Sequence, residues 1–190
     1  MALRFLAAPL LALGVAAGAH AQSLPYPGQP GKDVVWVPTP FTLVEKMLDM
    51  AGVTAQDYVI DLGSGDGRMI IAAAKRGARA LGVEYDSELI ELSRRYAAKE
   101  GVADKASFVR GDMFEADISQ ATVLALFLLP DNLRKLKPKF EKLKPGTRIV
   151  TNGFPIDGWE AKEVGKAERD CDSWCTAYLY VVPGRKAKSR

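Results

Sequence analysis

Three acidic residues, each at the end of a short apolar run, are the side chains best placed in this chain to hold a polar ligand. Asp61 ends the run "YVID", Glu84 ends "RALGVE" and Asp112 ends "ASFVRGD". A carboxylate accepts charge-assisted hydrogen bonds from hydroxyl, amino and ammonium groups. If the three runs are parallel strands, their carboxyl ends meet at one edge of a sheet, where open α/β sheets bind ligands.

The first acid opens a glycine-rich segment, "DLGSGDGR", with glycines at positions 63, 65 and 67. Glycines allow a tight turn and let ligand atoms approach the backbone, because no Cβ is in the way. A nicotinamide dinucleotide site needs the spacing G-x-G-x-x-G, and counting from Gly63 places Arg68 where the third glycine belongs. Asp61 would also repel a pyrophosphate. The segment therefore favours a cationic ligand with a free amino group over a dinucleotide.

Strand and helix patterns alternate along the chain and would position these residues. Strands are predicted at 58–63, 79–85, 106–112, 122–129 and 147–154, with a closing hairpin at 161–168 and 176–183. Helices are predicted at 44–51, 68–77, 87–101 and 132–146, the last with a break at Pro138. Near-continuous apolar strands indicate a sheet covered on both faces. The pattern predicts a doubly wound, mostly parallel, Rossmann-like α/β sheet of seven strands with an antiparallel C-terminal hairpin.

The chain begins with the features of an export signal. Arg4 precedes an uncharged segment rich in Leu and Ala, and the small residues of "AHA" predict a signal peptide over residues 1–21 with cleavage before Gln22. The alternative is that this segment stays uncleaved and anchors the protein in a membrane. In either case the positive charge before the apolar run places the domain outside the cytoplasm, in the periplasm or the medium. The rest divides into a proline-rich arm at 22–40, one domain at 41–183 and a basic tail at 184–190.

Composition excludes several kinds of chemistry. The formal net charge of +3 is too small to indicate nucleic-acid binding. The single histidine, His20, lies in the expected signal, so a mature chain has no histidine base or triad. Two cysteines cannot complete a tetrahedral zinc site, and no metal is expected. In an exported chain, Cys171 and Cys175 favour a disulfide, and Trp174 between them is expected to pack rather than to contact an acceptor.

From about Pro38 to Val182 the chain resembles class I S-adenosylmethionine-dependent methyltransferases. "DLGSGDGR" is similar to their first motif, "VEYD" to their ribose-binding acid and "GDMF" to their adenine-side acid. The resemblance implies S-adenosylmethionine as cofactor, with Asp61 holding the amino group at its methionine end. The expected cofactor-binding residues are Asp61, Gly63, Ser64, Gly65, Gly67, Glu84, Tyr85, Asp112, Met113, Thr39 and Pro40.

The segment "VPTPFTLVEKML", at residues 37–48, narrows the resemblance. It is similar to protein lysine methyltransferases that include the non-SET histone lysine enzyme and the mitochondrial enzymes acting on a component of ATP synthase and on the adenine nucleotide translocase. This implies methyl transfer to a protein lysine, with Thr39 and Pro40 covering the cofactor. Thr39 as a helix cap and Pro40 in the first helical turn is a compatible alternative. The competing functions are a small-molecule methyltransferase and a secreted, non-catalytic S-adenosylmethionine-binding module.

The acceptor side is expected after the fourth strand, at "FLLPDN". Many amine methyltransferases have [ND]-P-P-[YF] here, whereas the lysine subgroup has a similar "YLLP". Asp131 can either accept the proton of the acceptor or cap the following helix, and we favour the cap. No catalytic base is assigned. The residues expected to line an acceptor channel are Phe127, Leu128, Leu129, Pro130, Asp131, Asn152 and Phe154.

Basic residues recur along the helix predicted after this segment. They form either a solvated face or a patch for an acidic protein or anionic lipid, which would allow association with a membrane surface. The oligomeric state is not predicted. The residues are Arg134, Lys135, Lys137, Lys139, Lys142 and Lys144.

Overall fold

The structure, a computed structural model, describes residues 25–29, 31, 33 and 35–184. The expected signal peptide, its cleavage point and the tail after Gly184 lie outside the described residues. Among the residues that are described, none of the helices is both long enough and apolar enough to cross a membrane.

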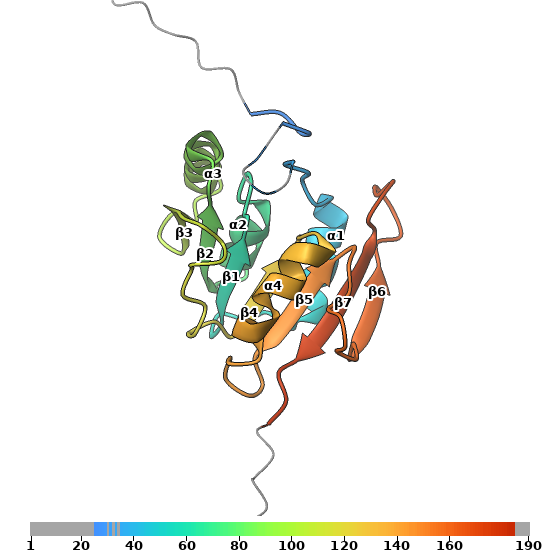
Figure 1. Ribbon diagram of the computed structural model, residues 1–190. Helices are drawn as coiled ribbons and strands as arrows, with labels where there is room; N and C mark the ends of the chain where they lie inside the picture. The colour runs from blue at the N-terminus through green and yellow to red at the C-terminus, as the bar shows by residue number, and fades with distance from the viewer. Residues whose placement is uncertain (1–24, 30, 32, 34, 185–190) are drawn as a thin grey trace, which may run out of the picture.

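Seven strands form one sheet in the described part of the chain, in the order β3-β2-β1-β4-β5-β7-β6 (Figure 1). All the pairings from β3 across to β5 are parallel, while β7 is antiparallel to β5 and to β6. The predicted sheet and its C-terminal hairpin are thus confirmed. The strands are β1 (Tyr58–Leu62), β2 (Arg79–Glu84), β3 (Ala106–Arg110), β4 (Val123–Leu126), β5 (Arg148–Asn152), β6 (Glu163–Lys166) and β7 (Thr176–Val181).

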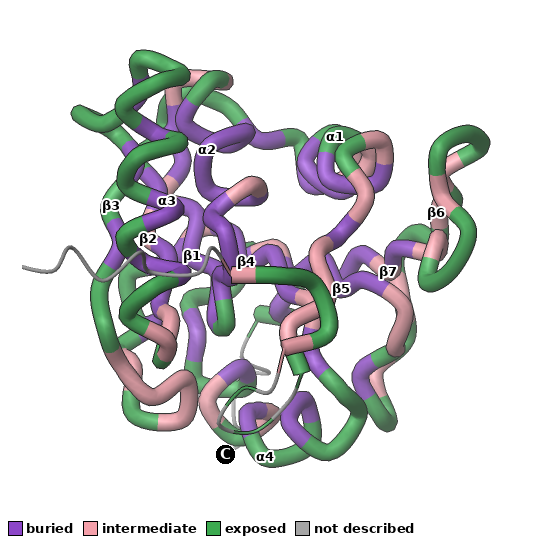
Figure 2. The backbone as a smooth tube through the Cα atoms, turned by 90° about the horizontal axis from the view of Figure 1, so that it is seen from above, coloured by how far each residue is buried: buried purple, intermediate pink, exposed green. Residues whose placement is uncertain are grey.

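Four helices in the described residues cover the two faces of the sheet unequally (Figure 2). Three pack on one face, and α4 covers the other together with the loops at 111–122 and 153–162. Leu133, Leu136 and Phe140 of α4 are fully buried or nearly so. Burial on both faces explains the continuous apolar runs of the central strands. The helices are α1 (Phe41–Met50), α2 (Arg68–Lys75), α3 (Ser87–Lys99) and α4 (Pro130–Phe140).

The region around α4 differs from the prediction in three ways. The expected break at Pro138 is wrong, because the helix continues through this residue to Phe140, which is fully buried. The helix also begins at Pro130 rather than at 132 and ends at Phe140 rather than at 146. Strand β4 ends at Leu126 rather than at Leu129. Leu129 is still extended, as a residue before proline must be, but the ladder between β4 and β5 has already ended at Leu126.

Basic side chains of α4 hold the two loops that share its face of the sheet. The Lys139 ammonium donates hydrogen bonds to the carbonyl oxygens of Phe114 and Ala116, the second at 2.8 Å. Lys137 donates to the carbonyl of Asp157 at 2.6 Å. Much of the basic face expected from the sequence is therefore engaged within the protein. These contacts favour a structural role over a partner-binding patch.

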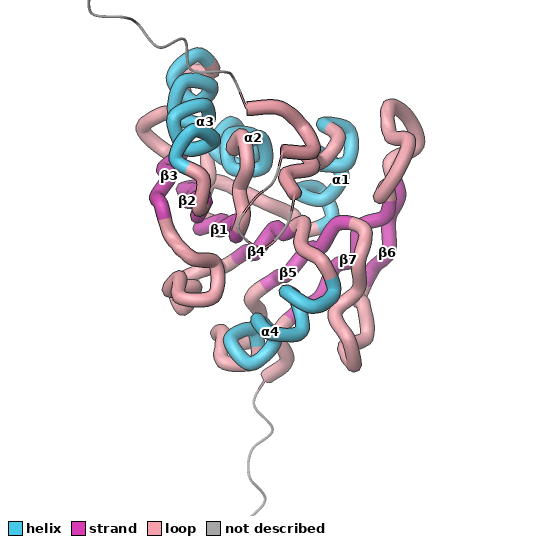
Figure 3. The backbone as a smooth tube through the Cα atoms, turned by 45° about the horizontal axis from the view of Figure 1, so that its top comes forward, coloured by secondary structure: helices cyan, strands magenta, loops and turns pink. Residues whose placement is uncertain are grey.

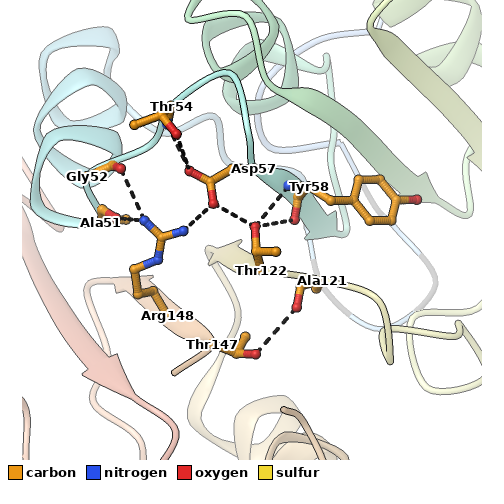
Figure 4. A network of polar contacts seen from close by, with 9 residues as sticks. All are labelled: Ala51, Gly52, Thr54, Asp57, Tyr58, Ala121, Thr122, Thr147 and Arg148. Carbon is orange, nitrogen blue, oxygen red and sulfur yellow. Dashed lines mark hydrogen bonds and ion pairs between the residues drawn. The ribbon is translucent and has the colours of Figure 1, made fainter. Parts of the chain in front are cut away.

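A polar network ties the amino ends of β1, β4 and β5 together (Figure 4). The three acids lie at the opposite, carboxyl ends of their strands. Asp57, just before β1, accepts hydrogen bonds from the Thr54 backbone N–H at 2.8 Å and the Thr122 hydroxyl at 2.7 Å. The Arg148 guanidinium pairs with the same carboxylate and donates to the carbonyl of Ala51 at 2.6 Å. The network joins the end of α1 to the starts of β1, β4 and β5, and the carboxyl ends remain available for a ligand.

Candidate active site

A cleft opens at the carboxyl ends of β1, β2, β3 and β4, and residues 35–39, just before α1, line it. Figure 3 shows the strands and helices that surround this end of the sheet. Asp61, Glu84 and Asp112 all line this cleft, as their positions at the ends of parallel strands predict. Strands β2 and β3 are added on one side of β1, and β4 and β5 on the other. This change in the order of the strands, between β1 and β4, marks the point where doubly wound sheets bind ligands.

The environment of Asp61 favours a positively charged ligand. This residue is only 7% exposed. Burial raises the pKa of its carboxyl well above the ordinary value of 3.8, and the negative charges of Glu84 and Asp66 raise it further, against the hydrogen bond from the Leu62 backbone N–H. A cationic group beside Asp61 would relieve both the burial and the repulsion. A strongly perturbed carboxyl in a cleft is also a typical mark of a functional site.

Glu84 is oriented by backbone groups on both sides of the cleft. Its Oε2 accepts from the N–H of Gly65 at 2.8 Å. Its Oε1 accepts from the N–H groups of Tyr85 and Asp86 at 2.7 and 3.0 Å. These bonds lock the glycine loop to the end of β2, so the carboxylate is held in place before any ligand arrives.

The three loop glycines have different tasks. Each has a positive φ, between 56° and 79°. Gly63 and Gly65 line the cleft, and a Cβ on Gly65 would lie 2.5 Å from Nε1 of Trp36. Gly67 is not part of the lining; its Cβ would meet Phe108 and Ser93 within 2.8 Å, so it allows α2 to pack against the sheet. Gly67 therefore supports the glycine loop from behind and does not itself line the cleft.

Three further residues predicted from the sequence also line the cleft. Asp112 accepts from the Phe114 backbone N–H at 2.8 Å, which orients its carboxylate at the start of a tight turn. Tyr85 and Met113 lie beside the acids in the cleft lining.

The donor set of the cleft suits S-adenosylmethionine. Asp61 favours a cation, and two more strand-end acids, Glu84 and Asp112, line the same cleft and can accept from hydroxyl and amino groups. Ser64 also lines the cleft. Its buried hydroxyl has no hydrogen-bond partner among the described residues and lies against Gly82 of β2, where an added Cβ would be 2.5 Å away.

The arm before α1 covers the cleft. The sequence predicted this role for Thr39 and Pro40 only. Trp36, Val37 and Pro38 line the cleft together with Thr39. Pro40 does not line it: it is the N-cap residue of α1 and makes no side-chain cap bond. The alternative in which Thr39 caps the helix is therefore wrong. Its hydroxyl accepts instead from the Asn152 amide at 3.3 Å.

Arg68 fastens this cover to the start of α2. Its guanidinium pairs with Asp66 at 2.6 Å and donates to the carbonyl of Thr39 at 2.8 Å. It also lies 4.6 Å from the ring centroid of Phe41. The residue that breaks the dinucleotide spacing thus has a structural reason for its position.

We expect Arg68→Met to weaken S-adenosylmethionine binding about tenfold, the equivalent of one charge-assisted hydrogen bond of roughly 1.5 kcal/mol. The cause is a loosened cover, because the bond to Thr39 is lost. Calorimetric titration measures the change. Arg95→Met, an exposed position on α3, serves as the matched control. Equal affinities of the Arg68→Met variant and the wild type would contradict the role of Arg68 in holding the cover over the cleft.

The acceptor candidates divide into two groups. Phe127, Leu128, Leu129 and Phe154 line the cleft beyond the cofactor end. Pro130, Asp131 and Asn152 do not.

Asp131 is not the helix cap either, since Leu129 occupies that position. It lies in the first turn of α4, pairs with Arg134 at 2.7 Å and keeps 78% of its side chain exposed. Asn152 is fully buried below Thr39. Neither side chain is placed to take a proton from an acceptor in the cleft.

Some lining residues were not identified from the sequence. Asp66 and Arg68 belong to the glycine-rich segment, but only its first acid, its glycines and Ser64 were predicted to bind. Trp36 is a large aromatic residue in a proline-rich arm, and this feature could have predicted a contact with the cleft. Trp174 lines the cleft although packing alone was expected for it. The predicted disulfide between Cys171 and Cys175 is present.

Known proteins with similar sequences are methyltransferases. The family model for the ANTKMT methyltransferase domain matches residues 61–163. A protein-lysine N-methyltransferase of Saccharolobus islandicus is 49% identical over 156 residues, which is 80% of this chain and 96% of that protein. A human protein named as a lysine N-methyltransferase of ATP synthase is 36% identical over 107 residues, and the match spans 56% of this chain and 46% of that protein.

A solved structure has a similar fold over most of the chain. It is described as an RNA methyltransferase from Salinibacter ruber in complex with S-adenosyl-L-homocysteine. The two chains share 42% identity with a TM-score of 0.73, and the match covers 80% of this chain and 98% of the other.

Proposed function

Because the chain belongs to the ANTKMT methyltransferase family, we propose that it transfers a methyl group from S-adenosylmethionine to a lysine side chain of a protein. The observation that carries the proposal is the buried Asp61, whose surroundings favour a cation, in one cleft with two further strand-end acids. The relative from Saccharolobus islandicus, named as a protein-lysine N-methyltransferase, supports lysine as the acceptor.

Different residues of the cleft would bind different groups of the cofactor. Bound S-adenosylmethionine supplies an electrophilic methyl group on a sulfonium. Asp61 would bind its amino group, Glu84 the ribose hydroxyls and Asp112 the adenine amino group, each through charge-assisted hydrogen bonds. The backbone of Gly63 allows close approach, while the space beside Gly65 admits Trp36 of the cover. The chain's contribution to the transfer is positioning and exclusion of water rather than covalent help.

A lysine acceptor must lose its proton before it can accept a methyl group. Phe127, Leu128 and Phe154 line the acceptor end of the cleft. An apolar surrounding disfavours the charged form and lowers the pKa of an entering lysine. We propose that this desolvation, rather than a dedicated base, prepares the nucleophile: the ammonium releases its proton to bulk water on entry, and the neutral nitrogen keeps the lone pair that accepts the methyl group.

An RNA acceptor is the second candidate, because the similar structure from Salinibacter ruber is described as an RNA methyltransferase. RNA binding relies on cations that neutralise phosphates. In this protein Lys137 and Lys139 are hydrogen-bonded to loop carbonyls, and the formal net charge is only +3. These observations favour a protein acceptor over RNA. A small-molecule acceptor and a non-catalytic binding module are the remaining alternatives.

A transfer assay with three acceptor pools tests the proposal. The protein is incubated with methyl-labelled S-adenosylmethionine and cell protein, the same protein with its lysines acetylated, or purified RNA. We expect label in the first pool only, recovered as methyl-lysine by mass spectrometry. Label in RNA, or label that survives acetylation, would refute a lysine acceptor. Binding of the cofactor without any transfer would support the non-catalytic module.

We also propose that the protein acts outside the cytoplasm, either released there or held at the membrane by its first residues. Two observations support this location. The start of the chain has the features of a signal peptide, and disulfides such as Cys171–Cys175 persist in oxidising compartments. Because S-adenosylmethionine is a cytoplasmic product, the proposal requires that some cofactor reaches the enzyme. N-terminal sequencing of the protein from its own cells should give Gln22 if the segment is cleaved, or an intact N-terminus in the membrane fraction if the segment is an anchor. An intact N-terminus in the cytoplasmic fraction would contradict export.

A further inference from the structure

We infer that Trp174, held by the disulfide-closed turn of residues 171–175, forms a wall of the site that receives the acceptor's alkylammonium side chain. The inference rests on the proposed lysine acceptor, and it adds a substrate-positioning role for a residue far from the cofactor motifs.

Trp174 lies between β6 and β7, yet its side chain reaches the acceptor end of the cleft. It lines the cleft with Phe127 and Phe154. Its ring centroid is 6.0 Å from that of Phe127, with the two planes tilted by 55°. It also packs on Gly153, where a Cβ would lie 3.0 Å from the Trp174 Cδ1. The turn after β5 therefore has no side chain where the indole sits.

The backbone around Trp174 is held in an unusual conformation. Its φ is 50°, a left-handed value that is uncommon for a bulky residue and costs about 1–3 kcal/mol. Three connections fix the turn around it. The disulfide joins Cys171 to Cys175, the Ala167 N–H donates to the Cys175 carbonyl at 2.9 Å, and the Thr42 hydroxyl donates to the Arg169 carbonyl at 2.9 Å.

Stability alone does not account for this arrangement. Trp174 is 46% exposed, so much of its apolar surface gains nothing from the core. A strained backbone that presents a half-exposed indole to a cleft is instead typical of a ligand-binding position. The disulfide then has a specific task, which is to hold the ring against the cleft rather than only to clamp a turn.

The aromatic wall suits an alkylammonium chain. The Trp174 indole is 46% exposed, so it meets the side chain as it arrives from water as an ammonium, and its face attracts that cation by about 0.5–2 kcal/mol. The proton is lost further in, beside the buried Leu128, where desolvation disfavours the charge. The four methylene groups of a lysine can pack along the rings of the wall. Methylation keeps the positive charge and adds apolar surface, so the wall accepts a lysine in successive methylation states.

Kinetics of the variants provide the first test, with the protein acceptor labelled by the wild type. We expect Trp174→Ala to raise the KM for the acceptor about tenfold, the equivalent of about 1.4 kcal/mol of lost ring contact. The affinity for S-adenosylmethionine should not change, and Trp174→Phe should recover part of the loss. Ser173→Ala, in the same turn but outside the cleft lining, is the control. An unchanged KM in Trp174→Ala would overturn the inference.

A double-mutant cycle tests the task of the disulfide. Replacing both Cys171 and Cys175 by Ser should raise the acceptor KM in the same direction as Trp174→Ala. Combining the replacements should add little, because the disulfide acts through the ring. Additive losses, or a loss of cofactor affinity in the cysteine variant, would show that the disulfide supports the fold instead.

A binding measurement separates this inference from the proposed function, because it needs no turnover. The full chain is labelled with 5-fluorotryptophan, and Trp174→Phe identifies the fluorine resonance of Trp174. Titration with n-butylammonium in the presence of S-adenosylhomocysteine should shift this resonance to saturation, whereas n-butanol should not. Absence of a saturable shift overturns the alkylammonium site even if lysine methylation is observed. A saturable shift without protein methylation leaves the site standing and refutes the proposed function.

Discussion

Asp61→Asn is expected to make the protein more stable and at the same time to weaken its cofactor binding about 100-fold. The binding loss follows because a buried charge-assisted hydrogen bond of roughly 3 kcal/mol becomes a neutral one. The gain in stability follows from the raised pKa of Asp61, which arises from burial first and then from Glu84 and Asp66. Stability and function therefore oppose one another at this residue.

The sign of the stability effect depends on pH. Because the pKa is raised in the folded state, the native protein holds this proton more readily than the unfolded chain does. Stability therefore falls as pH rises from the ordinary value of 3.8 through the raised pKa, and the full penalty applies above it. Asparagine removes the penalty. At pH 8 we expect the melting temperature to rise by about 2–4 °C, the equivalent of about 1 kcal/mol; the gain should vanish below the ordinary carboxyl pKa.

Thermal unfolding and calorimetry across pH measure both effects. In the wild type, affinity for S-adenosylmethionine should decline as pH falls, because Asp61 must ionise to pair with the cationic ligand. The Asp61→Asn variant should lack this dependence. Asp104→Asn, at an exposed turn carboxylate, is the matched control. A destabilised Asp61→Asn protein at pH 8, or one that binds the cofactor normally, would contradict this account of the cleft.

Asp57→Ala is expected to lower the free energy of unfolding by about 3 kcal/mol at neutral pH, in the range for a broken buried ion pair. Asp57 is 8% exposed, and its loss leaves the Arg148 guanidinium without its carboxylate. Arg148 also holds the end of α1 through the Ala51 carbonyl. The variant should keep its affinity for S-adenosylmethionine at temperatures where it is folded, because the network lies at the opposite end of the strands.

Asp57 should also determine part of the loss of folding stability at acid pH. Burial raises the pKa of Asp57, but the hydrogen bonds from Thr54 and Thr122 and the interaction with Arg148 outweigh it and leave the pKa lowered. Its stabilising contribution is therefore present above the ordinary value of 3.8 and is lost as pH falls through the lowered pKa. Urea unfolding at several pH values should show a smaller loss of stability on acidification in Asp57→Ala than in wild type. Asp104→Ala is the control, and equal acid dependence in wild type and Asp57→Ala would argue against the network.

The parts of the site that the sequence predicted are those controlled by local pattern. Asp61, Glu84 and Asp112 each end an apolar run, and parallel pairing brings the ends of such runs to one edge regardless of detail. The glycine loop was recognisable for the same reason, since its spacing and its place after a strand are both local. The sheet and its hairpin followed from the order of these runs.

The parts that could not be predicted depend on contacts between distant segments. Trp36 packs over Gly65, and Trp174 packs on Gly153, because of how the arm and the hairpin fold back. Helix limits were also wrong where packing overrides a local preference. Helix α4 continues past Pro138 to Phe140, which is fully buried. The positions of proline and glycine in the sequence do not reveal this burial.

Calorimetric titration of the full chain with S-adenosylmethionine, and separately with NAD, is the most direct test of the central claim about the cleft. We predict one site for S-adenosylmethionine with a Kd in the micromolar range, about −8 kcal/mol, and no binding of NAD. Glu84→Gln, in a protein that remains folded, should weaken the first titration. Failure of S-adenosylmethionine to bind the folded protein, or tighter binding of NAD, would contradict the assignment of these acids and of the glycine loop.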